Sequence, residues 1–434
     1  MSHEAALRAA VPEDVAGLMG ELRAAGFAAY VVGGAVRDTL AGRTPADWDL
    51  ATDATPDQLR SAFPDAQYEN RFGTVGIPTS EGVREVTTFR ADGPSSDARR
   101  PDAITFLGAI EGDLARRDFT INAMAFGAPS GAHGDPVASG TLTDPFGGAA
   151  DLAAGVLRAV GDAGERFQED ALRMLRAVRF ATRFSLTIES ATAAAIRRDA
   201  ALVTTLSGER IGAEIEGILA AENPAPGLHA LHELGLTAQI APELRAAWVA
   251  ELPARVAAVG RAGSQDAPDP IGRLAELLAV LTDDAVVEKL LTAWRRPRAT
   301  LHAVAALRAV DRSAAAAEHG EADAASYRIA TAAQSGDPRD AARQLRRRIA
   351  SGRATPAAAT LLALCERADE QQIPALVADL AADGAEIIAA INEQPGAWVK
   401  PLLEELLQEV AHGRVENRRD ALAAAAKQLH EKQR

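Results

Sequence analysis

The spacing of apolar residues divides the chain into two parts that meet near residue 160. In the first part, short apolar runs alternate with clusters of Gly, Pro, Asp and Ser, a pattern typical of strands joined by turns. Strands are predicted at 27–32, 47–52, 73–79, 83–89, 104–106 and 156–160. Helices are predicted at 12–25, 55–63 and 112–125, and Thr55 with Pro56 supplies a cap and a first-turn proline for the second of them. These elements predict a small domain that mixes helices and strands.

The second part, from residue 161 onward, places apolar residues three or four apart and has few β-branched runs. This spacing predicts helices almost throughout. Glycine and proline interrupt the pattern near 207–208, 223–227, 262–270, 335–338 and 394–396. The fold class expected from the two parts is α+β with several domains.

Composition excludes several classes of protein. Hydrophobic residues make up 47% and charged residues 24%, which are ordinary values for globular proteins and exclude a mainly disordered chain. No apolar run approaches the roughly 20 residues of a membrane span, and the first fifteen residues carry no apolar signal segment. The single cysteine, Cys365, excludes an internal disulfide and a cysteine-built zinc site. We therefore expect a cytoplasmic protein with no membrane partner.

The formal net charge of −14 argues weakly against a nucleic-acid partner. Net charge is a poor guide, however, when basic residues cluster. Residues 166–210 hold eight arginines against five acids, and two further basic clusters lie at 294–298 and 346–348. Each cluster could contact nucleic-acid phosphate or be a solvated face.

Two aspartates, Asp47 and Asp49, flank Trp48 in a predicted strand. Side chains two residues apart in a strand point to the same face, so both carboxylates would converge on one spot. Two like charges held this close need a cation, and hard oxygen ligands suit Mg²⁺. Two solvated carboxylates at a strand end would have the same spacing, so the surrounding residues decide between the two interpretations.

The segment VVGGAVRD at 31–38 begins shortly before this pair and contains Gly33, Gly34 and Arg37. Glycines let a backbone come close to a phosphate, and the N-terminus of a following helix favours anions. The segment matches neither the dinucleotide fingerprint nor a Walker loop, and the alternative is a plain strand–helix turn. A phosphate cradle ahead of a carboxylate pair indicates a nucleoside triphosphate bound with Mg²⁺.

Five further residues fit the same chemistry. Glu85 lies in an alternating strand and could be a third carboxylate or an ordinary exposed glutamate. Arg116 and Arg117 precede an apolar stretch, and one of them could bind the triphosphate because a guanidinium fork matches phosphate oxygens. A solvated arginine pair is the alternative. Asp118 and Asn122, one helical turn apart, are expected to hold this domain together or to order Arg117 rather than to react.

A helical segment at 169–181 carries Asp170, Arg173, Arg176 and Arg179 at intervals of three. This spacing makes a ridge that rotates by about 60° at each step. A charged solvent face would show the same pattern. Three like charges along one ridge mildly destabilise a helix, so an anionic ligand is a reasonable cause of the ridge.

Together these motifs resemble those of the class II tRNA nucleotidyltransferases, the CCA-adding enzymes, within the polymerase-β-like nucleotidyltransferase superfamily. The similar segments follow the family's order across about 33–215, roughly half of the chain. They are GGAVRD with DWDLAT, REVTTFR with the loop that follows it, DLARRDFTINAMAF, DPFGGAADL, EDALRMLRAVRFA and SGERIGAEI. Beyond residue 226 the similarity is loose.

The resemblance implies a polymerase-β-like head with a mixed sheet over 1–160. A helical neck over 161–225 with the base-recognition motif, a helical body over 226–320 and a tRNA-binding helical tail over 321–434 would follow. The implied reaction transfers nucleotides from CTP and ATP to the 3′ hydroxyl of tRNA without a nucleic-acid template and releases pyrophosphate. Asp47 and Asp49 would hold two Mg²⁺ ions, with Glu85 as the third carboxylate.

The resemblance also implies which residues bind the nucleotide. The triphosphate would be held by Gly33, Gly34, Arg37 and Arg117, and further nucleotide or phosphate contacts are implied for Arg176 and Arg179. Asp170 and Arg173 would read the base, because a carboxylate only accepts hydrogen bonds and a guanidinium only donates them. Cytosine and adenine both present an amine beside a ring-nitrogen acceptor, whereas uracil and guanine present the reverse order. One Asp–Arg pair would therefore accept C and A and refuse U and G.

Two alternatives stay open. The nearer is a poly(A) polymerase, or a specialist that adds only CC or only A, from the same family. The arginine- and histidine-rich signature of the family's poly(A) polymerases is absent after the strand REVTTFR. The loop at 91–102, which the resemblance links to the switch from C to A, is not visibly shortened, and this disfavours a CC-adding enzyme. The distant alternative is a non-catalytic tRNA-binding protein, against which the intact carboxylates and arginines speak.

Overall fold

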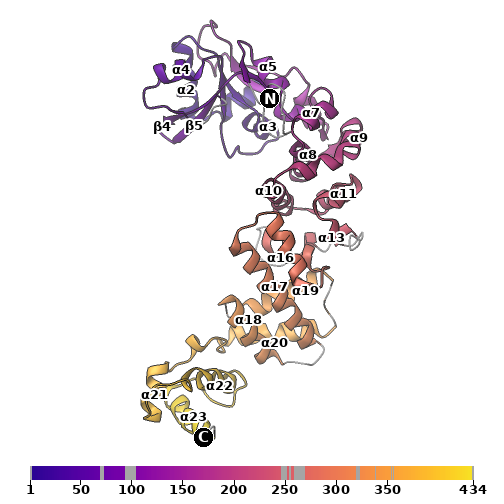
Figure 1. Ribbon diagram of the computed structural model, residues 1–434. Coiled ribbons are helices and arrows are strands. Elements are labelled where there is room, and N and C mark those ends of the chain that lie inside the picture. The colour runs from indigo at the N-terminus through magenta and orange to yellow at the C-terminus, as the bar shows by residue number, and fades with distance from the viewer. Residues whose placement is uncertain are drawn as a thin grey trace. The chain divides into compact units, whose positions relative to one another are not determined.

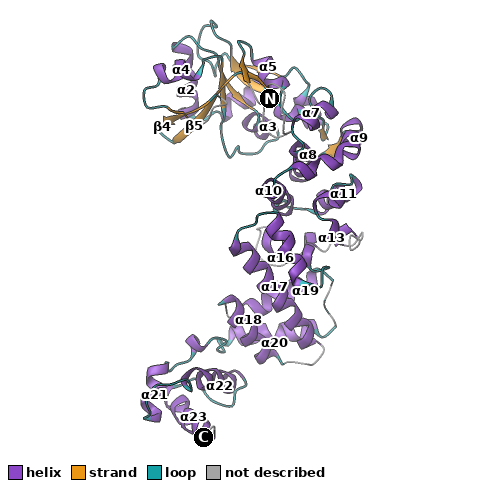
Figure 2. Ribbon diagram, in the orientation of Figure 1, coloured by secondary structure: helices purple, strands orange, loops and turns teal. Residues whose placement is uncertain are grey.

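The computed structural model describes residues 2–68, 73–92, 104–245, 252–253, 256–258, 269–318, 323–337, 339–352, 354 and 356–432. It confirms the α+β class, with a mixed sheet in the N-terminal part and helices in most of the remainder (Figures 1 and 2). The chain forms two compact units. The first comprises Met1–Ile218 with Gly227–Arg245, and the second comprises Leu219–Pro226 with Ala246–Arg434.

A seven-stranded sheet, counted over the described residues, forms the centre of the first unit. Its order is β3-β4-β5-β2-β1-β8-β9, in which β2 and β5 are parallel and the other neighbours are antiparallel. The strands are β1 (Ala29–Val32), β2 (Leu50–Thr52), β3 (Gln67–Tyr68), β4 (Thr74–Thr79), β5 (Gly82–Thr88), β8 (Ala125–Ala128) and β9 (Thr141–Thr143). Two small two-stranded sheets pair β6 (Arg90–Asp92) with β7 (Ile104–Phe106), and β10 (Val156–Leu157) with β11 (Thr187–Ile188).

Strand β1 is buried on both faces. Val31 points into a hydrophobic cluster with Leu50 and Trp48, which the helices around the strands complete. Tyr30 and Val32 belong to the cluster on the opposite face. A continuous apolar run is expected of a strand that is covered on both sides. The core therefore fixes the end of β1, from which the chain continues toward Asp47 and Asp49.

The helices of the first unit complete the head and continue beyond it. They are α1 (His3–Ala10), α2 (Glu13–Ala24), α3 (Gly34–Leu40), α4 (Pro56–Ala62), α5 (Ile110–Ala115), η1 (Thr120–Asn122), α6 (Gly148–Ala153), α7 (Ala163–Glu169), α8 (Leu172–Phe184), α9 (Ser190–Asp199), η2 (Ala200–Thr205), α10 (Gly208–Leu219), α11 (Ala225–Glu233), α12 (Thr237–Ile240) and α13 (Pro242–Arg245). Thr55 caps α4 with a capping box and Pro56 opens the helix, as the sequence predicts.

The second unit is helical where the structure describes it. Its helices include α15 (Pro270–Leu278), α16 (Asp284–Ala293), α17 (Arg298–Glu318), α18 (Ala324–Ser335), α19 (Asp340–Ala350), α20 (Ala358–Glu370), η3 (Val377–Asp379), α21 (Gly384–Ile391), α22 (Val399–Ala411) and α23 (Arg419–Lys432). Their bounds match the breaks predicted near 335–338 and 394–396. Over the described residues, no helix is both long enough and apolar enough to cross a membrane.

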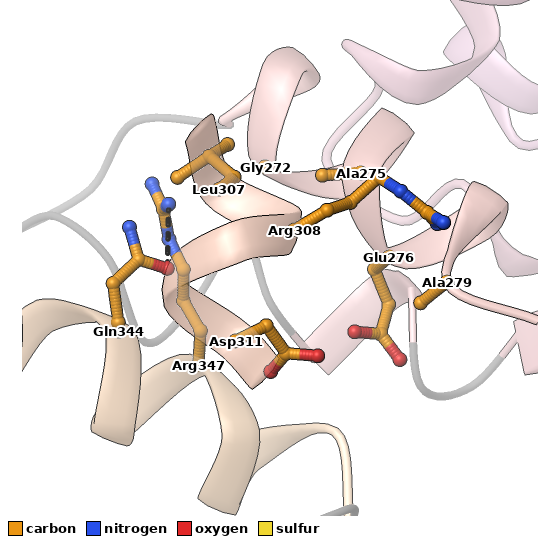
Figure 3. A pocket seen from close by; sticks show the side chains of 9 residues that line it. All are labelled: Gly272, Ala275, Glu276, Ala279, Leu307, Arg308, Asp311, Gln344 and Arg347. Atoms are coloured by element: carbon orange, nitrogen blue, oxygen red, sulfur yellow. Dashed lines mark hydrogen bonds between the residues drawn. The ribbon is translucent and has the colours of Figure 1, made fainter. Parts of the chain in front are cut away.

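A small pocket between α15, α17 and α19 is lined by polar groups of the second unit (Figure 3). Its volume of about 30 Å³ has room for little more than one water. Arg308 donates to the carbonyls of Leu278 and Leu281, and Asp311 accepts from Arg348. These groups tie helices together, and the pocket is far too small for a nucleotide.

The predicted helix over 112–125 is wrong. Helix α5 ends at Ala115, the short helix η1 follows, and the chain then enters β8 beside β1. The apolar run from Phe119 to Phe126 is almost completely buried, so it has no polar face that would reveal its period. The predicted strand 47–52 is shorter as well and begins at Leu50, although the Val32 N–H still donates to the Asp49 carbonyl at 3.0 Å.

The close contact between β1 and β8 makes a testable prediction. A Cβ atom at Gly127 would overlap the carbonyl oxygen of Ala29, and backbone cannot move aside as a side chain can. We expect Gly127→Ala to destabilise the head by about 1–3 kcal/mol. Gly20→Ala is the matched control, because a Cβ at this position of α2 meets open space. The substitution also removes the entropic cost of a glycine within a helix. Thermal unfolding should show a lower midpoint for the first variant and an equal or higher one for the second; equal midpoints for both would refute the packing argument.

Candidate active site

One pocket of the first unit brings together most of the residues singled out from the sequence. Its volume is about 550 Å³. Nine of the predicted site residues line it, namely Gly33, Gly34, Arg37, Asp49, Arg117, Asp170, Arg173, Arg176 and Arg179. Asp47 and Glu85 are not among the lining residues. Several other residues that line the pocket were not predicted from the sequence, among them Phe180, Arg183 and Arg210.

The two aspartates come directly before β2, an internal strand of the sheet that pairs with β1. Trp48 between them is buried in the core, so the carboxylates of Asp47 and Asp49 point away from it and stay exposed. Asp49 keeps exposed surface, but the protein around its carboxylate displaces part of the surrounding water, and this desolvation raises the pKa of Asp49. The negative charge of Asp47 raises it further. Two carboxylates that disfavour each other's charge are a suitable pair of ligands for a cation.

The position of Glu85 follows from the pairing of β2 with β5. Leu50 lies opposite Val86, so the register places Glu85 beside Asp49. Glu85 is exposed, and within the described part of the chain no group of three or more His, Cys, Asp or Glu side chains is arranged to hold a metal. Its role as a third carboxylate stays a prediction.

Gly33 is the point where β1 turns into α3. Its φ of 65° is a conformation that favours glycine, and a Cβ there would lie 2.5 Å from Nη1 of Arg117. Arg117 donates from Nη1 to the Asn122 carbonyl and from Nη2 to Asp113. The absence of a side chain at Gly33 therefore lets the Arg117 guanidinium lie against the backbone at the floor of the pocket.

Arg37 is buried deeper than expected for a phosphate ligand. Its guanidinium donates to Asp38 at 2.8 Å and to the Asn122 side chain at 2.5 Å, and it lies 4.4 Å from the ring centroid of Phe184. Burial lowers the pKa of Arg37, while the adjacent Asp38 acts to raise it. The structure thus gives Arg37 an internal partner, and its contact with a triphosphate stays a prediction.

The arginine ridge on α8 is neutralised by acids from other elements. Arg173 pairs with Glu169 at 3.0 Å, Arg176 with Asp118 at 2.7 Å and Arg179 with Glu214 at 2.5 Å. Because these acids neutralise the arginines, the helix is stable without a bound anion. The repulsion between like charges is therefore no reason to infer a ligand. The remaining observation in favour of an anionic ligand is that all three arginines line one pocket.

Asp118 holds this region together, in line with the structural role expected for it. It accepts from Asn122 at 3.0 Å and from Arg176 at 2.8 Å. Burial acts to raise the pKa of Asp118, but the charge of Arg176 and these hydrogen bonds outweigh it and lower the pKa. An ionised, fully paired carboxylate thus fixes α8 against the head.

Asp170 lies between α7 and α8, and both of its oxygens are held. One accepts from the Leu172 N–H at 3.0 Å, and the other accepts from Arg210 of α10 at 2.7 Å. Arg173, one turn along α8, also donates to the Arg116 carbonyl at 2.9 Å. The predicted pair Asp170 and Arg173 is therefore placed in one pocket with each side chain anchored separately.

A sequence signal for Arg210 did exist. Arg210 and Glu214 are four residues apart in the segment SGERIGAEI, and each directly precedes a buried apolar residue, Ile211 or Ile215. Polar side chains flanked by buried ones at helical spacing point toward a packed neighbour, and here they reach Asp170 and Arg179.

The fold and the pocket define a nucleotidyltransferase head joined to helical domains. The poly A polymerase head domain matches residues 29–158. The "Probable RNA and SrmB-binding site of polymerase A" matches 185–247, and tRNA nucleotidyltransferase domain 2 matches 274–426.

Known relatives specify the family further. The chain is 34% identical to the CCA-adding enzyme of Geobacillus thermodenitrificans over 95% of this chain and 96% of that one. It is 39% identical to the CCA-adding enzyme of Lactiplantibacillus plantarum over 67% and 68% of the two chains. The crystal structure of the Bacillus stearothermophilus CCA-adding enzyme in complex with CTP superposes with a TM-score of 0.75 at 29% identity, over 97% and 98% of the chains. The chain belongs to the CCA-adding enzymes, the class II tRNA nucleotidyltransferases.

The contact between Gly33 and Arg117 can be tested directly. In Gly33→Ala the new Cβ would displace the Arg117 guanidinium, so we expect nucleotidyltransferase activity to fall by at least about tenfold, the scale set by losing one charge-assisted contact. Gly42→Ala is the control, because Gly42 also has a positive φ, of 69°, but a Cβ there meets open space. Both variants carry a backbone strain of about 1–2 kcal/mol. If both lose activity equally, strain rather than Arg117 is responsible.

Proposed function

We propose that this protein adds the 3′-terminal CCA to tRNA from CTP and ATP without a nucleic-acid template. The observation that carries the proposal is the shared pocket, in which a metal-type carboxylate, Asp49, lies with the base-reading pair Asp170 and Arg173. Membership in the CCA-adding family over nearly the whole chain supports the same reaction. The proposed partners are the tRNA 3′ end, CTP and ATP.

A divalent metal is the cofactor of nucleotidyltransferases of this kind, and we propose Mg²⁺. Asp47 and Asp49 fit it, since Mg²⁺ takes one or two protein carboxylates and completes its shell with water and substrate phosphates. Desolvation and the negative charge of Asp47 both raise the pKa of Asp49, and a bound cation would offset both effects. When bound, the metal would lower the pKa of the attacking hydroxyl and neutralise charge on the α-phosphate.

The chain's own residues would position the reacting groups. The 3′ oxygen of tRNA forms a bond to the α-phosphorus, the hydroxyl proton leaves, and the bond to pyrophosphate breaks. Arg117 against Gly33 would hold the triphosphate with its fork of donors. Gly34, Arg37, Arg176 and Arg179 line the same pocket, and we propose that they contact the nucleotide or order those that do. Glu85 beside Asp49 completes the proposed catalytic carboxylates.

Asp170 and Arg173 would act as the template. The Asp170 carboxylate accepts from the amine of cytosine or adenine, and Arg173 donates to the adjacent ring nitrogen. Uracil and guanine would leave a buried charged group unpaired, which costs about 1–3 kcal/mol or more. The internal contacts of both side chains use only part of their hydrogen-bonding capacity.

The division into head, neck, body and tail at 160, 225 and 320 remains a proposal, as does a cytoplasmic location. The structure itself separates two units rather than four. The loop predicted to govern the switch from C to A lies, from residue 93 to residue 102, outside the described residues.

Three substrates test the reaction. Wild-type protein would be incubated with labelled CTP or ATP and with tRNAs that end before CCA, after C, or after CC. A CCA-adding enzyme labels the first two with CTP and the third with ATP only. If ATP labels all three tRNAs, the protein is a poly(A) polymerase. If only CTP or only ATP is incorporated, the protein is a specialist that adds only CC or only A.

Removing one carboxylate tests the metal site. We expect Asp49→Asn, and likewise Asp47→Asn, to abolish transfer but to leave tRNA affinity within about threefold, because the carboxylates serve chemistry rather than docking. Excess EDTA should reproduce the loss and added Mg²⁺ should restore the wild type. Asp57→Asn on exposed α4 is the control. A variant that keeps more than about a tenth of the wild-type rate would remove that residue from the metal site.

Changing the base-reading pair tests the template. Asp170→Ala should lower discrimination against UTP by about 10- to 100-fold, since the acceptor that repels the uracil carbonyl is gone. Arg173→Ala should raise KM for CTP and ATP together. Steady-state kinetics with all four nucleotides measures both effects. If either substitution abolished C addition and spared A addition, two separate base pockets would be implied.

Arg210→Ala extends this test to a positioning residue. It removes the Nη2 donor that holds Asp170, so discrimination against UTP should fall in the same direction but by less. Arg210→Lys keeps a donor and should restore part of the discrimination. If Arg210→Ala changes only kcat, the contact does not position the template.

A further inference from the structure

Eight arginines line the active-site pocket, and seven of them pair with a carboxylate. The partners are Asp38 for Arg37, Asp113 for Arg116 and Arg117, Glu169 for Arg173, Asp118 for Arg176, Glu214 for Arg179 and Asp170 for Arg210. Arg183, at the C-terminal end of α8, is different. It is exposed and has no carboxylate partner among the described residues. Its charge is therefore available to a ligand.

A second exposed arginine lies next to it. Arg43, in the turn between α3 and Asp47, lies 4.8 Å from the ring centroid of Phe184, and Arg183 lies 5.3 Å from the same centroid. Arg43 donates to the Arg183 carbonyl at 3.3 Å. No described carboxylate pairs with Arg43 either. Two exposed guanidinium groups are thus held on one aromatic ring with no acid to neutralise them.

The shared ring orients both side chains. A guanidinium within about 6 Å of an aromatic face is held there, while its N–H groups at the edge stay available. Phe184 itself is buried and Arg37 lies against it too, with its own charge neutralised by Asp38. The net positive charge at this point therefore comes from Arg43 and Arg183. Its chemical complement is a phosphate group.

The position of the pair separates two sources of phosphate. Arg183 lines the pocket but Arg43 does not, so the pair lies at the pocket rim and is open to solvent. The nucleotide triphosphate is proposed to lie deeper, against Gly33 and Arg117. An RNA strand, in contrast, enters from solvent and carries a phosphate at every nucleotide. Arg43 is four residues before Asp47, on the segment that leads to the reacting carboxylates.

We propose that Arg43 and Arg183, stacked on Phe184, bind a backbone phosphate of the RNA acceptor strand at the entrance to the active site. The inference rests on the proposed function for the identity of the RNA. It assigns a role to two arginines that the sequence reasoning left unassigned. The pair guides the 3′ end toward the carboxylates and takes no part in bond formation.

The test measures RNA binding without catalysis. Affinity for a tRNA that ends before CCA would be measured by fluorescence anisotropy, without nucleotide or metal, at 50 and 200 mM KCl. We expect Arg43→Gln with Arg183→Gln to weaken binding about five- to tenfold and to reduce the slope of log K against log salt by about 0.7–0.9, the amount that one lost phosphate contact accounts for. Affinity for CTP, measured without RNA, should stay unchanged.

Two further variants guard the interpretation. Arg43→Lys with Arg183→Lys keeps both charges and should retain most of the salt dependence, whereas a purely structural role for the two arginines would not be rescued by charge. Arg60→Gln is the matched control, because Arg60 is an exposed arginine on α4 that does not line the pocket. It should leave RNA affinity unchanged.

Two results would overturn the proposal. Weaker CTP binding with unchanged RNA affinity would assign the pair to the triphosphate. Unchanged affinity for both ligands would make the two arginines ordinary solvated side chains. Because binding is measured without turnover, these results stay distinct from a failure of the proposed function, which would appear as wild-type protein that binds tRNA but adds no nucleotide.

Discussion

Most of the guanidinium groups around the pocket are neutralised by carboxylates, because unpaired like charges at this density would repel one another. This requirement governs how the elements around the pocket are arranged. The carboxylates come from α3, α5, α7 and α10 and from the turn before η1, whereas three of the arginines come from α8 alone. Removing one partner of a buried ion pair costs about 3–5 kcal/mol, because it leaves a charge without compensation. The pairs of Arg173, Arg176 and Arg179 therefore fix the position of α8 relative to three other elements.

The same constraint explains how side chains can replace a nucleic-acid template. A template must present its donors and acceptors in fixed positions, and flexible side chains on a surface do not. Asp170 is held by the Leu172 N–H and by Arg210, and Arg173 by Glu169 and the Arg116 carbonyl. Positions fixed in advance avoid the entropic cost of ordering long side chains when the base arrives. In the proposed function, the ion pairs around the pocket would therefore serve selectivity as well as folding.

Local features of the fold were readable from the sequence, and long-range pairings were not. The α4 cap at Thr55 and strands such as β1, β4 and β5 followed from spacing and turn residues, whereas β3, β8, β9 and β11 were not predicted. The close backbone approach expected at Gly33 is present, but toward Arg117; an approach to phosphate stays a prediction. The run at 119–126 was not assigned correctly, since complete burial removes the polar face that separates a strand from a helix. The ordered motifs pointed to nine residues that line the pocket, but the partners of Arg176 and Arg179 lie 58 and 35 residues away, a separation no local pattern encodes.

Net charge is misleading for this protein for the same physical reason. The chain carries 60 acidic and 46 basic side chains, which by itself disfavours an RNA partner. Many of the acids, however, are committed to arginines inside the fold, as Asp118 and Asp113 are in the first unit and Asp369 is with buried Arg328 in the second. A charge neutralised at hydrogen-bond distance contributes little to the field beyond about one Debye length, roughly 8 Å at physiological salt. Each ion pair removes one charge of each sign, so the excess of acids remains and is spread over the rest of the surface. An RNA phosphate that approaches the pocket is influenced mainly by charges within about that distance, and there Arg43 and Arg183, which pair with no described carboxylate, make the local charge positive although the total is negative.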